Sequence, residues 1–311
     1  MKILTITLNP AYDVYCKIPS FELYKENLIK STFTSPGGKG VNISRAMTVY
    51  GIPTAAYIVF GRENCGAFEN ALNSEKVPYV PFYTDGRIRE NYTVIPENAA
   101  ETRICFDSFT AGPEILDSVL SRIETDADAD DIIAFSGKFP GKIDRESKLR
   151  FLKKLKQLTK RLVIDTNSLD GKDIISLSPW LIKPNEQELE AFTGSRPSGL
   201  EDAANSAREI REAGVENVLV TLGGNGAAFA GKEIVITADA PKIDVLSSVG
   251  AGDSSISGFI AAFIRGEDSL GCFLNAVASG SAACLREGTA PPLQSDIEKL
   301  RPIIKPRTEN I

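Results

Sequence analysis

Hydrophobic residues along the chain fall into short continuous runs that alternate with stretches of helical spacing. The runs are rich in β-branched residues and predict buried strands. They are ILTITL (3–8), AAYIVF (55–60), DIIAFS (131–136), LVID (162–165), WLI (180–182) and NVLVTL (217–222). Helical spacing is clearest at Leu149, Leu152, Leu155 and Leu158, and at Ala203, Ala204, Ala207 and Ile210. This alternation predicts an α/β fold with a mostly parallel central sheet flanked by helices on both faces.

Two segments interrupt the alternation, at residues 11–34 and 86–107. Neither has a helical pattern, and both have the polar alternation of half-exposed strands. In the second segment, IRENYTVI and ETRICF flank Pro96–Ala100, which predicts a hairpin turn. We therefore expect a single domain over residues 1–311, with these segments forming a small β-sheet that projects from the main body as a lid. The polar tail after Pro291 predicts a terminal helix and a frayed end.

Charge and cysteine usage narrow the classes of function. A net charge of −6 argues against general binding of nucleic acid. The opening MKILTITLNP is too short for a signal peptide, and no run approaches the ~18 apolar residues of a membrane span. Five scattered cysteines without a CxxC favour reduced thiols and no zinc site. These features predict a cytoplasmic protein with a small-molecule ligand.

The chain contains no histidine, so general-base chemistry near neutral pH must use Asp, Glu, Lys, Tyr or Cys. Mechanisms that depend on a Ser–His or Cys–His pair are excluded. One carboxylate has an unusual setting, because Asp253 lies inside the glycine-rich stretch SSVGAGDSSISGF, residues 247–259. Apolar residues of helical spacing follow at Ile256, Phe259, Ile260 and Phe263. A helix is therefore expected to begin at residues 251–253.

The start of such a helix attracts an anion, because free backbone N–H groups and the positive end of the helix dipole meet there. A carboxylate at this place has two explanations. It can simply stabilise the helix dipole, or it can act as a base beside a bound phosphate. The Walker A pattern is absent, and Gly250-Ala251-Gly252 lacks the third glycine of a dinucleotide fingerprint. The usual phosphate-loop and Rossmann assignments therefore fail.

Three further motifs are ambiguous when each is taken alone. SPGGKGVN, residues 35–42, precedes a helical pattern and indicates either a tight turn or a backbone that faces a ligand. KPNEQELE, residues 183–190, has the form of a capping box, with Asn185 and Glu188 as its two members. TLGGNGAAF, residues 221–229, by itself predicts only a hairpin.

Taken together and in this order, GGKGVN, KPNEQE, TLGGNG and GAGD resemble the ribokinase-like sugar kinases of the phosphofructokinase B type. The resemblance extends from TLNPAYD at residues 7–13 to GTAPP at residues 288–292. TLNPAYD and SPGGKGVN look most like the branch that contains the 1-phosphofructokinases and tagatose-6-phosphate kinases. Ser247 departs from the family, where many members carry an acid or a lysine.

The resemblance implies a role for each matching residue. Asp253 would accept the proton of the sugar hydroxyl, while the amides of Gly250, Ala251 and Gly252 form an anion hole for the transferred phosphoryl group. Glu188, with Asn185, would organise Mg²⁺ largely through water. The sugar would be bound by Asp13, Gly37, Gly38, Lys39 and Asn42. ATP would be bound by Lys183, Asn185, Thr221, Gly223, Asn225, Gly226 and, as a weaker match, Asn275.

The hairpin also predicts where a substrate phosphate binds. If its turn centres on Asn98 without a bulge, Thr93 lies opposite Arg103, and Arg89 shares their face of the sheet. Arg89 and Arg103 match family positions that bind the sugar phosphate. Guanidinium groups are suited to this role, because they form paired hydrogen bonds with a phosphate. If Lys39 on the glycine turn converges with them, the three side chains form one basic pocket. Without the family, two solvated arginines would be the simpler interpretation.

The expected activity is ATP-dependent, Mg²⁺-assisted phosphorylation of a ketohexose phosphate, with fructose 1-phosphate converted to fructose 1,6-bisphosphate. A tagatose-6-phosphate kinase is the alternative enzyme, since a phosphorylated ketohexose can bind in either direction. A non-catalytic sugar-phosphate sensor on the same fold is a further alternative. Kinases of nucleosides or unphosphorylated sugars are disfavoured by the two arginines. A homodimer through the lid is also expected.

Overall fold

Residues 1–310 are the part of the chain that the computed structural model describes, and they form one ten-stranded sheet and one separate four-stranded sheet. The strand order of the large sheet is β14-β13-β12-β11-β10-β9-β8-β1-β4-β5. Its strands are β1 (Ile3–Thr7), β4 (Thr54–Gly61), β5 (Tyr79–Thr84), β8 (Ile132–Ser136), β9 (Arg161–Asp165), β10 (Leu181–Ile182), β11 (Asn217–Thr221), β12 (Ala227–Ala230), β13 (Ile234–Ala238) and β14 (Arg307–Asn310). Pairing is parallel from β5 to β11 and antiparallel from β11 to β14. The mostly parallel sheet expected from the sequence is confirmed.

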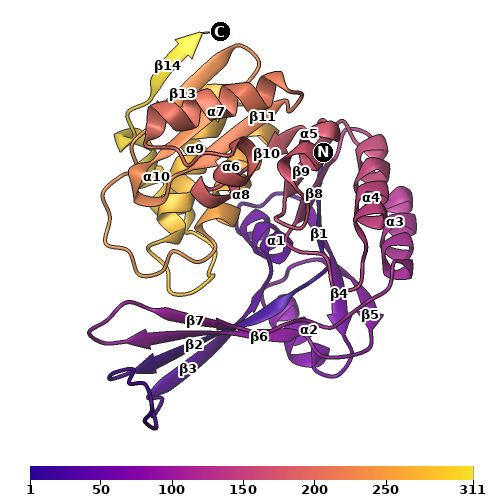
Figure 1. Cartoon of the computed structure of the whole chain (residues 1–311), viewed down its shortest axis with the longest axis vertical. Helices are drawn as coiled ribbons and strands as arrows, with labels where there is room; N and C mark the ends of the chain where they lie inside the picture. The colour runs from indigo at the N-terminus through magenta and orange to yellow at the C-terminus, as the bar shows by residue number, and fades with distance from the viewer. Residues whose placement is uncertain (311) are drawn as a thin grey trace.

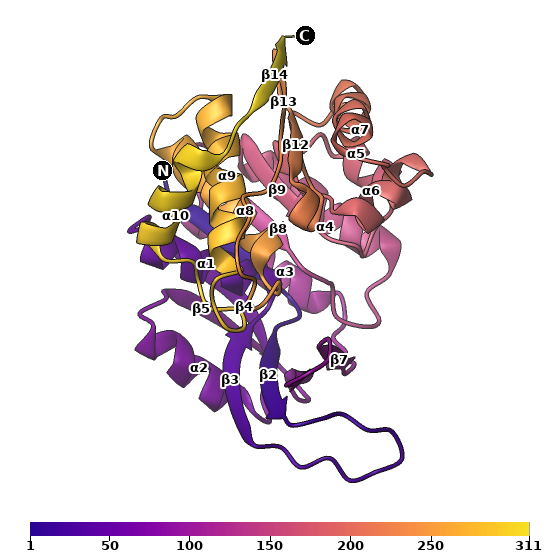
Figure 2. The same cartoon turned by 90° about the vertical axis from the view of Figure 1, so that its left-hand side faces the viewer.

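Helices cover both faces of this sheet, so the main body has three layers (Figure 2). One face carries α1 (Lys39–Val49), α2 (Cys65–Ser74), α8 (Ala251–Ile264), α9 (Ser269–Ala283) and α10 (Gln294–Leu300). The other carries α3 (Glu114–Asp126), α4 (Arg145–Leu158), α5 (Gly171–Ser176), α6 (Glu186–Thr193) and α7 (Leu200–Glu212). Every residue of β1 and of β8 is buried, because both faces are covered. This explains why these strands are continuous apolar runs in the sequence.

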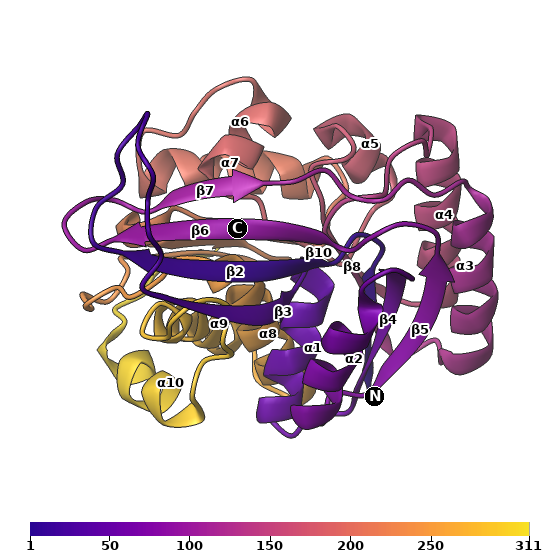
Figure 3. The same cartoon turned by 90° about the horizontal axis from the view of Figure 1, so that it is seen from below.

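The small sheet extends from the main body as a separate layer (Figures 1 and 3). Its order is β3-β2-β6-β7, formed by β2 (Ala11–Ile18), β3 (Ser31–Gly37), β6 (Arg89–Pro96) and β7 (Thr102–Cys105). β2 pairs in parallel with β6, and the other two pairings are antiparallel. The two segments that broke the strand–helix alternation are therefore outside the central sheet, as predicted. Thr93 lies opposite Arg103, so the predicted hairpin register is also confirmed.

The two faces of the small sheet have different surroundings. On one face Tyr12 packs against Phe68 of α2, with ring centroids 5.3 Å apart. Val14 and Cys16 belong to the same buried cluster. Because side chains alternate along a strand, Asp13 lies on the opposite face. The polar alternation of this segment therefore separates a packing face from a face that carries ionisable groups.

The end of the chain differs from the prediction. The expected terminal helix is α10, but the expected frayed end is wrong for Arg307–Asn310, which form β14 and pair with β13. An unpaired edge of β13 would leave backbone N–H and C=O groups without partners, and β14 satisfies them. The polar residues of this strand suit an edge position, and for the same reason they gave no apolar signal. Among residues 1–310, no helix has the length and apolar character that crossing a membrane requires.

Candidate active site

The sequence motifs meet at the carboxyl ends of the parallel strands. β1 leads into the small sheet, β9 ends at Asp165, and β10 is followed directly by Lys183. Asn185 forms a bridge with Thr221 at the end of β11. In open α/β sheets this edge is where ligands bind, because loops and helix N-termini converge there. The fold therefore brings together residues that are far apart in the sequence.

The N-terminus of α8 begins at Ala251, as the spacing of apolar residues predicted. Gly250 is the N-cap with φ of 81°, and the Ala251 N–H makes only a long bond of 3.4 Å to the Ser248 carbonyl. The first N–H groups of a helix have no partner within the helix, so they are available to an anion. The turn expected to be an anion hole therefore has suitable geometry.

Asp253 lies in the first turn of α8 and is buried. The Oδ2 atom of its carboxylate accepts a hydrogen bond of 2.8 Å from Asn42 Nδ2 in the first part of α1. Burial raises the pKa of Asp253 to about 6, and the Asp165 carboxylate acts in the same direction. The ammonium groups of Lys39 and Lys183 and the Asn42 bond oppose that rise. A carboxylate tuned in this way is ionised at neutral pH and is a stronger base than a solvated one.

Asp165 is a site residue that the sequence reasoning missed. It is buried, and its Oδ1 lies 3.1 Å from Lys39 Nζ, while its Oδ2 accepts a bond from Ser136. Burial alone would raise the pKa of Asp165, yet Lys39 and Lys183 hold it below its usual value. The available signal was its position as an acidic residue at the end of a buried strand, but no glycine motif marked it.

Lys39 pairs with carboxylates of the main body. Its ammonium group contacts Asp165, and it lies 3.6 Å from Glu188 Oε1. The carboxylates of Asp165, Asp253 and Glu188 raise the pKa of Lys39 despite its burial, so the side chain is a permanent cation. Lys39 thus lies in the part of the site that contains Asp165, Asp253 and Glu188.

Lys183 and the α6 N-terminus border the same space. A Cβ atom built on Gly252 would lie 3.0 Å from Lys183 Nζ, so glycine allows the ammonium group to approach the α8 N-terminus. The predicted capping box is present: the Glu188 N–H donates to Asn185 Oδ1 at 2.9 Å, and the Asn185 N–H donates to Glu188 Oε2 at 3.0 Å. The second oxygen, Oε1, remains directed to Lys39. Capping and a role in the site are therefore compatible for Glu188.

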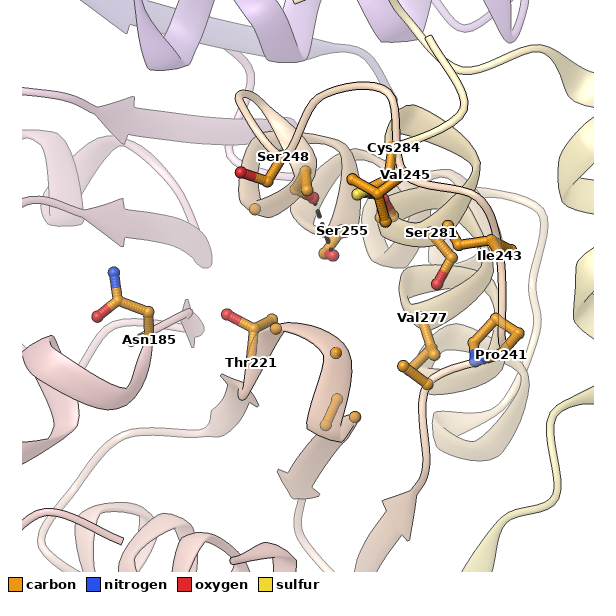
Figure 4. A pocket seen from close by; sticks show the side chains of 18 of the residues that line it. Asn185, Thr221, Pro241, Ile243, Val245, Ser248, Ser255, Val277, Ser281 and Cys284 are labelled. Carbon is orange, nitrogen blue, oxygen red and sulfur yellow. Dashed lines mark hydrogen bonds between the residues drawn. The ribbon is translucent and has the colours of Figure 1, made fainter. Parts of the chain in front are cut away.

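A cavity of about 540 Å³ adjoins the α8 N-terminus (Figure 4). Asn185 and Thr221 lie on one side of it, and Pro241, Ile243 and Val277 form an apolar wall on the other. The remaining lining residues are Lys183, Gly223, Gly224, Gly226, Ala227, Ala240, Lys242, Val245, Ser248, Ala251, Gly252, Ser255, Gly280, Ser281 and Cys284. Its polar end and apolar wall suit a nucleotide, with phosphates at the helix and a base at the wall.

Two residues expected at the nucleotide do not line this cavity. Asn225 is exposed on the turn between β11 and β12. Asn275 is buried between two helices, where its Nδ2 donates to the Gly258 carbonyl at 2.7 Å. The neighbouring part of the small-residue run does reach the cavity, through Val277 and Gly280. The segment 240–245 was missed, because its residues have no periodic pattern.

The face of the small sheet that carries Asp13 reaches the start of α1, because Asp13 touches Gly37 beside the N-cap Gly38. Asp13 is buried, and burial raises its pKa, although Arg103 and Arg89 oppose the rise. Arg89 is partly buried and Arg103 is exposed. Gly37 ends β3, next to Gly38, the N-cap of α1. The two predicted arginines and Asp13 therefore lie close enough to interact, as the shared face implied.

The acidic residues of the site are suited to a metal ion that is bound partly by the protein and partly by a substrate. Within residues 1–310 there is no group of three or more His, Cys, Asp or Glu side chains arranged to hold a metal ion. Mg²⁺ is commonly bound through one or two carboxylates, water and substrate phosphates, and does not require a complete protein cage. Glu188, with one oxygen outside the capping box, has the donor chemistry that such a role requires.

Comparisons with known proteins agree with this geometry. The model of the pfkB family carbohydrate kinases matches residues 8–296. The 1-phosphofructokinase of Haemophilus influenzae is 28% identical over 304 residues, covering 97% of this chain and 96% of that protein. The 1-phosphofructokinase of Bacillus subtilis is 27% identical and covers 97% of this chain and 98% of that protein.

The fold has a close counterpart among solved structures. Phosphofructokinase-2 from Escherichia coli, in complex with substrates and products, matches with a TM-score of 0.90 at 24% identity. The match covers 97% of this chain and 99% of that one. The ribokinase-like fold predicted from the glycine motifs is confirmed. Because the family match includes nearly all of the chain, this protein belongs to the pfkB family of carbohydrate kinases.

Proposed function

We propose that this protein transfers the γ-phosphoryl group of ATP to the 6-hydroxyl of fructose 1-phosphate. Family membership makes it a carbohydrate kinase, and therefore a phosphotransferase that uses ATP. The choice of sugar is supported by relatives of nearly full length that are named 1-phosphofructokinases. The observation that carries the proposal is the buried carboxylate of Asp253 beside the N-terminal amides of α8. A tagatose-6-phosphate kinase is not favoured by these relatives.

Asp253 is the general base in this proposal. It takes the proton of the sugar hydroxyl as that oxygen bonds to the γ-phosphorus and the bond to the β-phosphate oxygen breaks, releasing ADP. The amides of Gly250, Ala251 and Gly252 stabilise the charge that spreads over the transferred group. Lys183, next to Gly252, adds a positive charge at the same place. The carboxylate therefore acts on the attacking sugar hydroxyl, and the amides act on the transferred phosphoryl group.

We assign nucleotide binding to the cavity next to α8. Lys183, Asn185 and Thr221 belong to its polar end, and Gly223 and Gly226 belong to the turn that borders it. Mg²⁺ would be held by Glu188, with Asn185 nearby, through water and the nucleotide phosphates. When bound, the ion neutralises phosphate charge. This assignment is supported by the donor chemistry of Glu188 and by the position of α6 at the cavity.

We assign the sugar phosphate to the small sheet. Arg89 and Arg103 supply guanidinium groups suited to a phosphate, and Asp13 supplies an acceptor for sugar hydroxyls. Asn42, Gly37, Gly38 and Lys39 connect this region to Asp253. Closure of the sheet over the sugar would exclude water before transfer, so the sheet acts as a lid on the single kinase domain.

We also propose that the small sheet forms the contact of a homodimer. Its β2–β3 loop and β7 carry exposed apolar side chains, including Leu23, Leu28 and Ile104, and Phe106 follows directly after β7. Exposed apolar groups of this kind favour association, because association removes them from water. A monomeric mass in solution would remove this part of the proposal.

The choice of substrate is tested by comparing kcat/KM for fructose 1-phosphate, tagatose 6-phosphate, fructose 6-phosphate and free fructose. We expect fructose 1-phosphate to be preferred, with free fructose at least about a hundredfold poorer because it lacks two charge-assisted arginine contacts. A preference for tagatose 6-phosphate would support the alternative enzyme. Absence of turnover with every sugar, with ATP bound, would support a non-catalytic sensor.

The role of Asp253 is tested by Asp253→Asn, which preserves size and can still accept the Asn42 bond. We expect kcat to fall about 10²–10⁴-fold, because a general base is lost. Folding and the dissociation constant of ATP should remain close to those of the wild type. Asp130→Asn, an exposed aspartate that pairs with Lys160, is the control and should leave kcat unchanged. More than roughly a tenth of wild-type kcat in Asp253→Asn would overturn the assignment.

The role of Arg103 is tested by Arg103→Ala, with Arg87→Ala as the control. Arg87 is an exposed arginine just before β6, paired with Glu90 at 3.7 Å. We expect Arg103→Ala to lower kcat/KM for the sugar phosphate about ten- to a hundredfold and to leave KM for ATP nearly unchanged. The ratio of kcat/KM for fructose 1-phosphate to kcat/KM for free fructose should become smaller. Equal losses for the phosphorylated and free sugars would instead indicate that Arg103 supports only the structure of the sheet.

A further inference from the structure

Asp13 is held between neighbouring strands of the small sheet. It lies on β2, directly opposite Ser35 of β3 and Asn91 of β6. Residues that are directly opposite in a sheet project to the same face, so Asn91 belongs to the inner face with Asp13 and Arg89. Asn91 is buried, with 5% of its surface exposed.

Each oxygen of the Asp13 carboxylate has a defined neighbour. Oδ1 accepts a hydrogen bond of 3.1 Å from Asn91 Nδ2. Oδ2 lies over the backbone of Gly37, where a Cβ atom would approach it to 2.2 Å. Any side chain at position 37 would displace the carboxylate, so glycine leaves the space that it occupies. The hydrogen bond from Asn91 then restrains its orientation. Such a restraint suits a group that must meet a ligand in one geometry.

The second polar atom of the Asn91 amide has no partner. Because the ionised Asp13 can only accept, the Asn91 amide must direct its N–H group to it and its Oδ1 elsewhere. That Oδ1 is buried without a hydrogen bond within residues 1–310. Two further buried atoms lack a hydrogen-bond partner. They are Nε of Arg89, on the same face of β6, and Oδ1 of Asn42 in α1. Buried polar groups are normally paired, so unpaired atoms on a shared wall indicate a polar ligand.

We propose that Asn91 is a sugar-positioning residue that presents Asp13 in a fixed orientation and accepts a hydrogen bond from a sugar hydroxyl through its own Oδ1. Asp13 and Asn91 then offer two adjacent acceptors, which suits two hydroxyl groups of one sugar. This inference rests on the proposed function in that the ligand of the small sheet is a ketohexose phosphate. It adds a specificity-determining residue that the sequence motifs did not mark.

The electrostatic surroundings give the inference a second consequence. Burial raises the pKa of Asp13, and the Asn91 bond opposes this rise together with Arg103 and Arg89 from the small sheet and Arg45 from α1. Removal of the Asn91 donor removes one of the interactions that lower the pKa of Asp13. The effect of burial then dominates more strongly, so this pKa should rise further. Because the ionised carboxylate is the acceptor for hydroxyls, sugar binding in such a variant should be lost at a higher pH than in the wild type.

The test compares Asn91→Ala and Asn91→Asp with Thr93→Val. Asn91→Asp preserves the size of the side chain if the alanine variant folds poorly, but it replaces the donor with a second carboxyl group. Thr93 is a buried residue on the same strand and face, two positions along and opposite Tyr15, so its substitution is the matched control. Both Asn91 variants should raise KM for the sugar phosphate about ten- to a hundredfold while kcat and KM for ATP change little. Thr93→Val should change none of these.

A second measurement does not depend on activity. The carboxyl carbon of Asp13, observed by NMR in the free protein, should titrate at a higher pH in Asn91→Ala than in the wild type. An unchanged sugar KM together with an unchanged Asp13 titration would overturn the inference, even if the wild type phosphorylates fructose 1-phosphate. If the wild type phosphorylates no ketohexose phosphate, the proposed function fails, while the titration still decides whether Asn91 controls Asp13.

Discussion

Two buried carboxylates, Asp165 and Asp253, share a small volume with the ammonium groups of Lys39 and Lys183, and the chemistry of the site depends on that balance. Burying an ionised group is costly unless opposite charge compensates for it. Asp165 has Lys39 at 3.1 Å and remains well ionised, whereas Asp253 has a neutral amide as its direct partner, and its pKa is raised to about 6. The same group of charges therefore provides one carboxylate that holds a cation and one that can accept a proton.

The fold is what brings this group together. Asp165 ends β9, Lys183 follows β10, Lys39 begins α1, and Asp253 lies in the first turn of α8. Each is placed by a rigid element, at the strand and helix ends where a parallel sheet leaves a crevice. Close approach also requires the absence of side chains, and Gly252 allows it by leaving room for Lys183. The separate small sheet adds the arginines and Asp13 without disturbing the packed layers of the main body.

The sequence predicted those features that leave a local signal. The start of α8 follows from apolar spacing, the capping box from Asn185 and Glu188, and the hairpin register from its turn. Asp165 was missed because its role arises from a cation contributed by a distant helix. Asn91 was missed because its contact crosses two strands that pair in parallel, and a parallel pairing of β2 with β6 cannot be read from either strand alone. Asn275 does not line the cavity, because a run of small residues predicts close helix packing and does not say which side chains face the cavity.

The central claim is that Asp253 must be ionised for turnover and that Lys39 keeps its pKa below the value that burial alone would impose. The direct measurement is the acid limb of the pH dependence of kcat/KM for the sugar phosphate, compared between the wild type and Lys39→Met. Because Lys39 lowers the pKa of Asp253 from the value that burial would impose, its removal should move the limb from about pH 6 to a higher pH. Ionisation of the substrate phosphate is the same for both enzymes, so the shift belongs to the protein. A limb that stays in place, or moves to lower pH while activity remains measurable, would contradict this account.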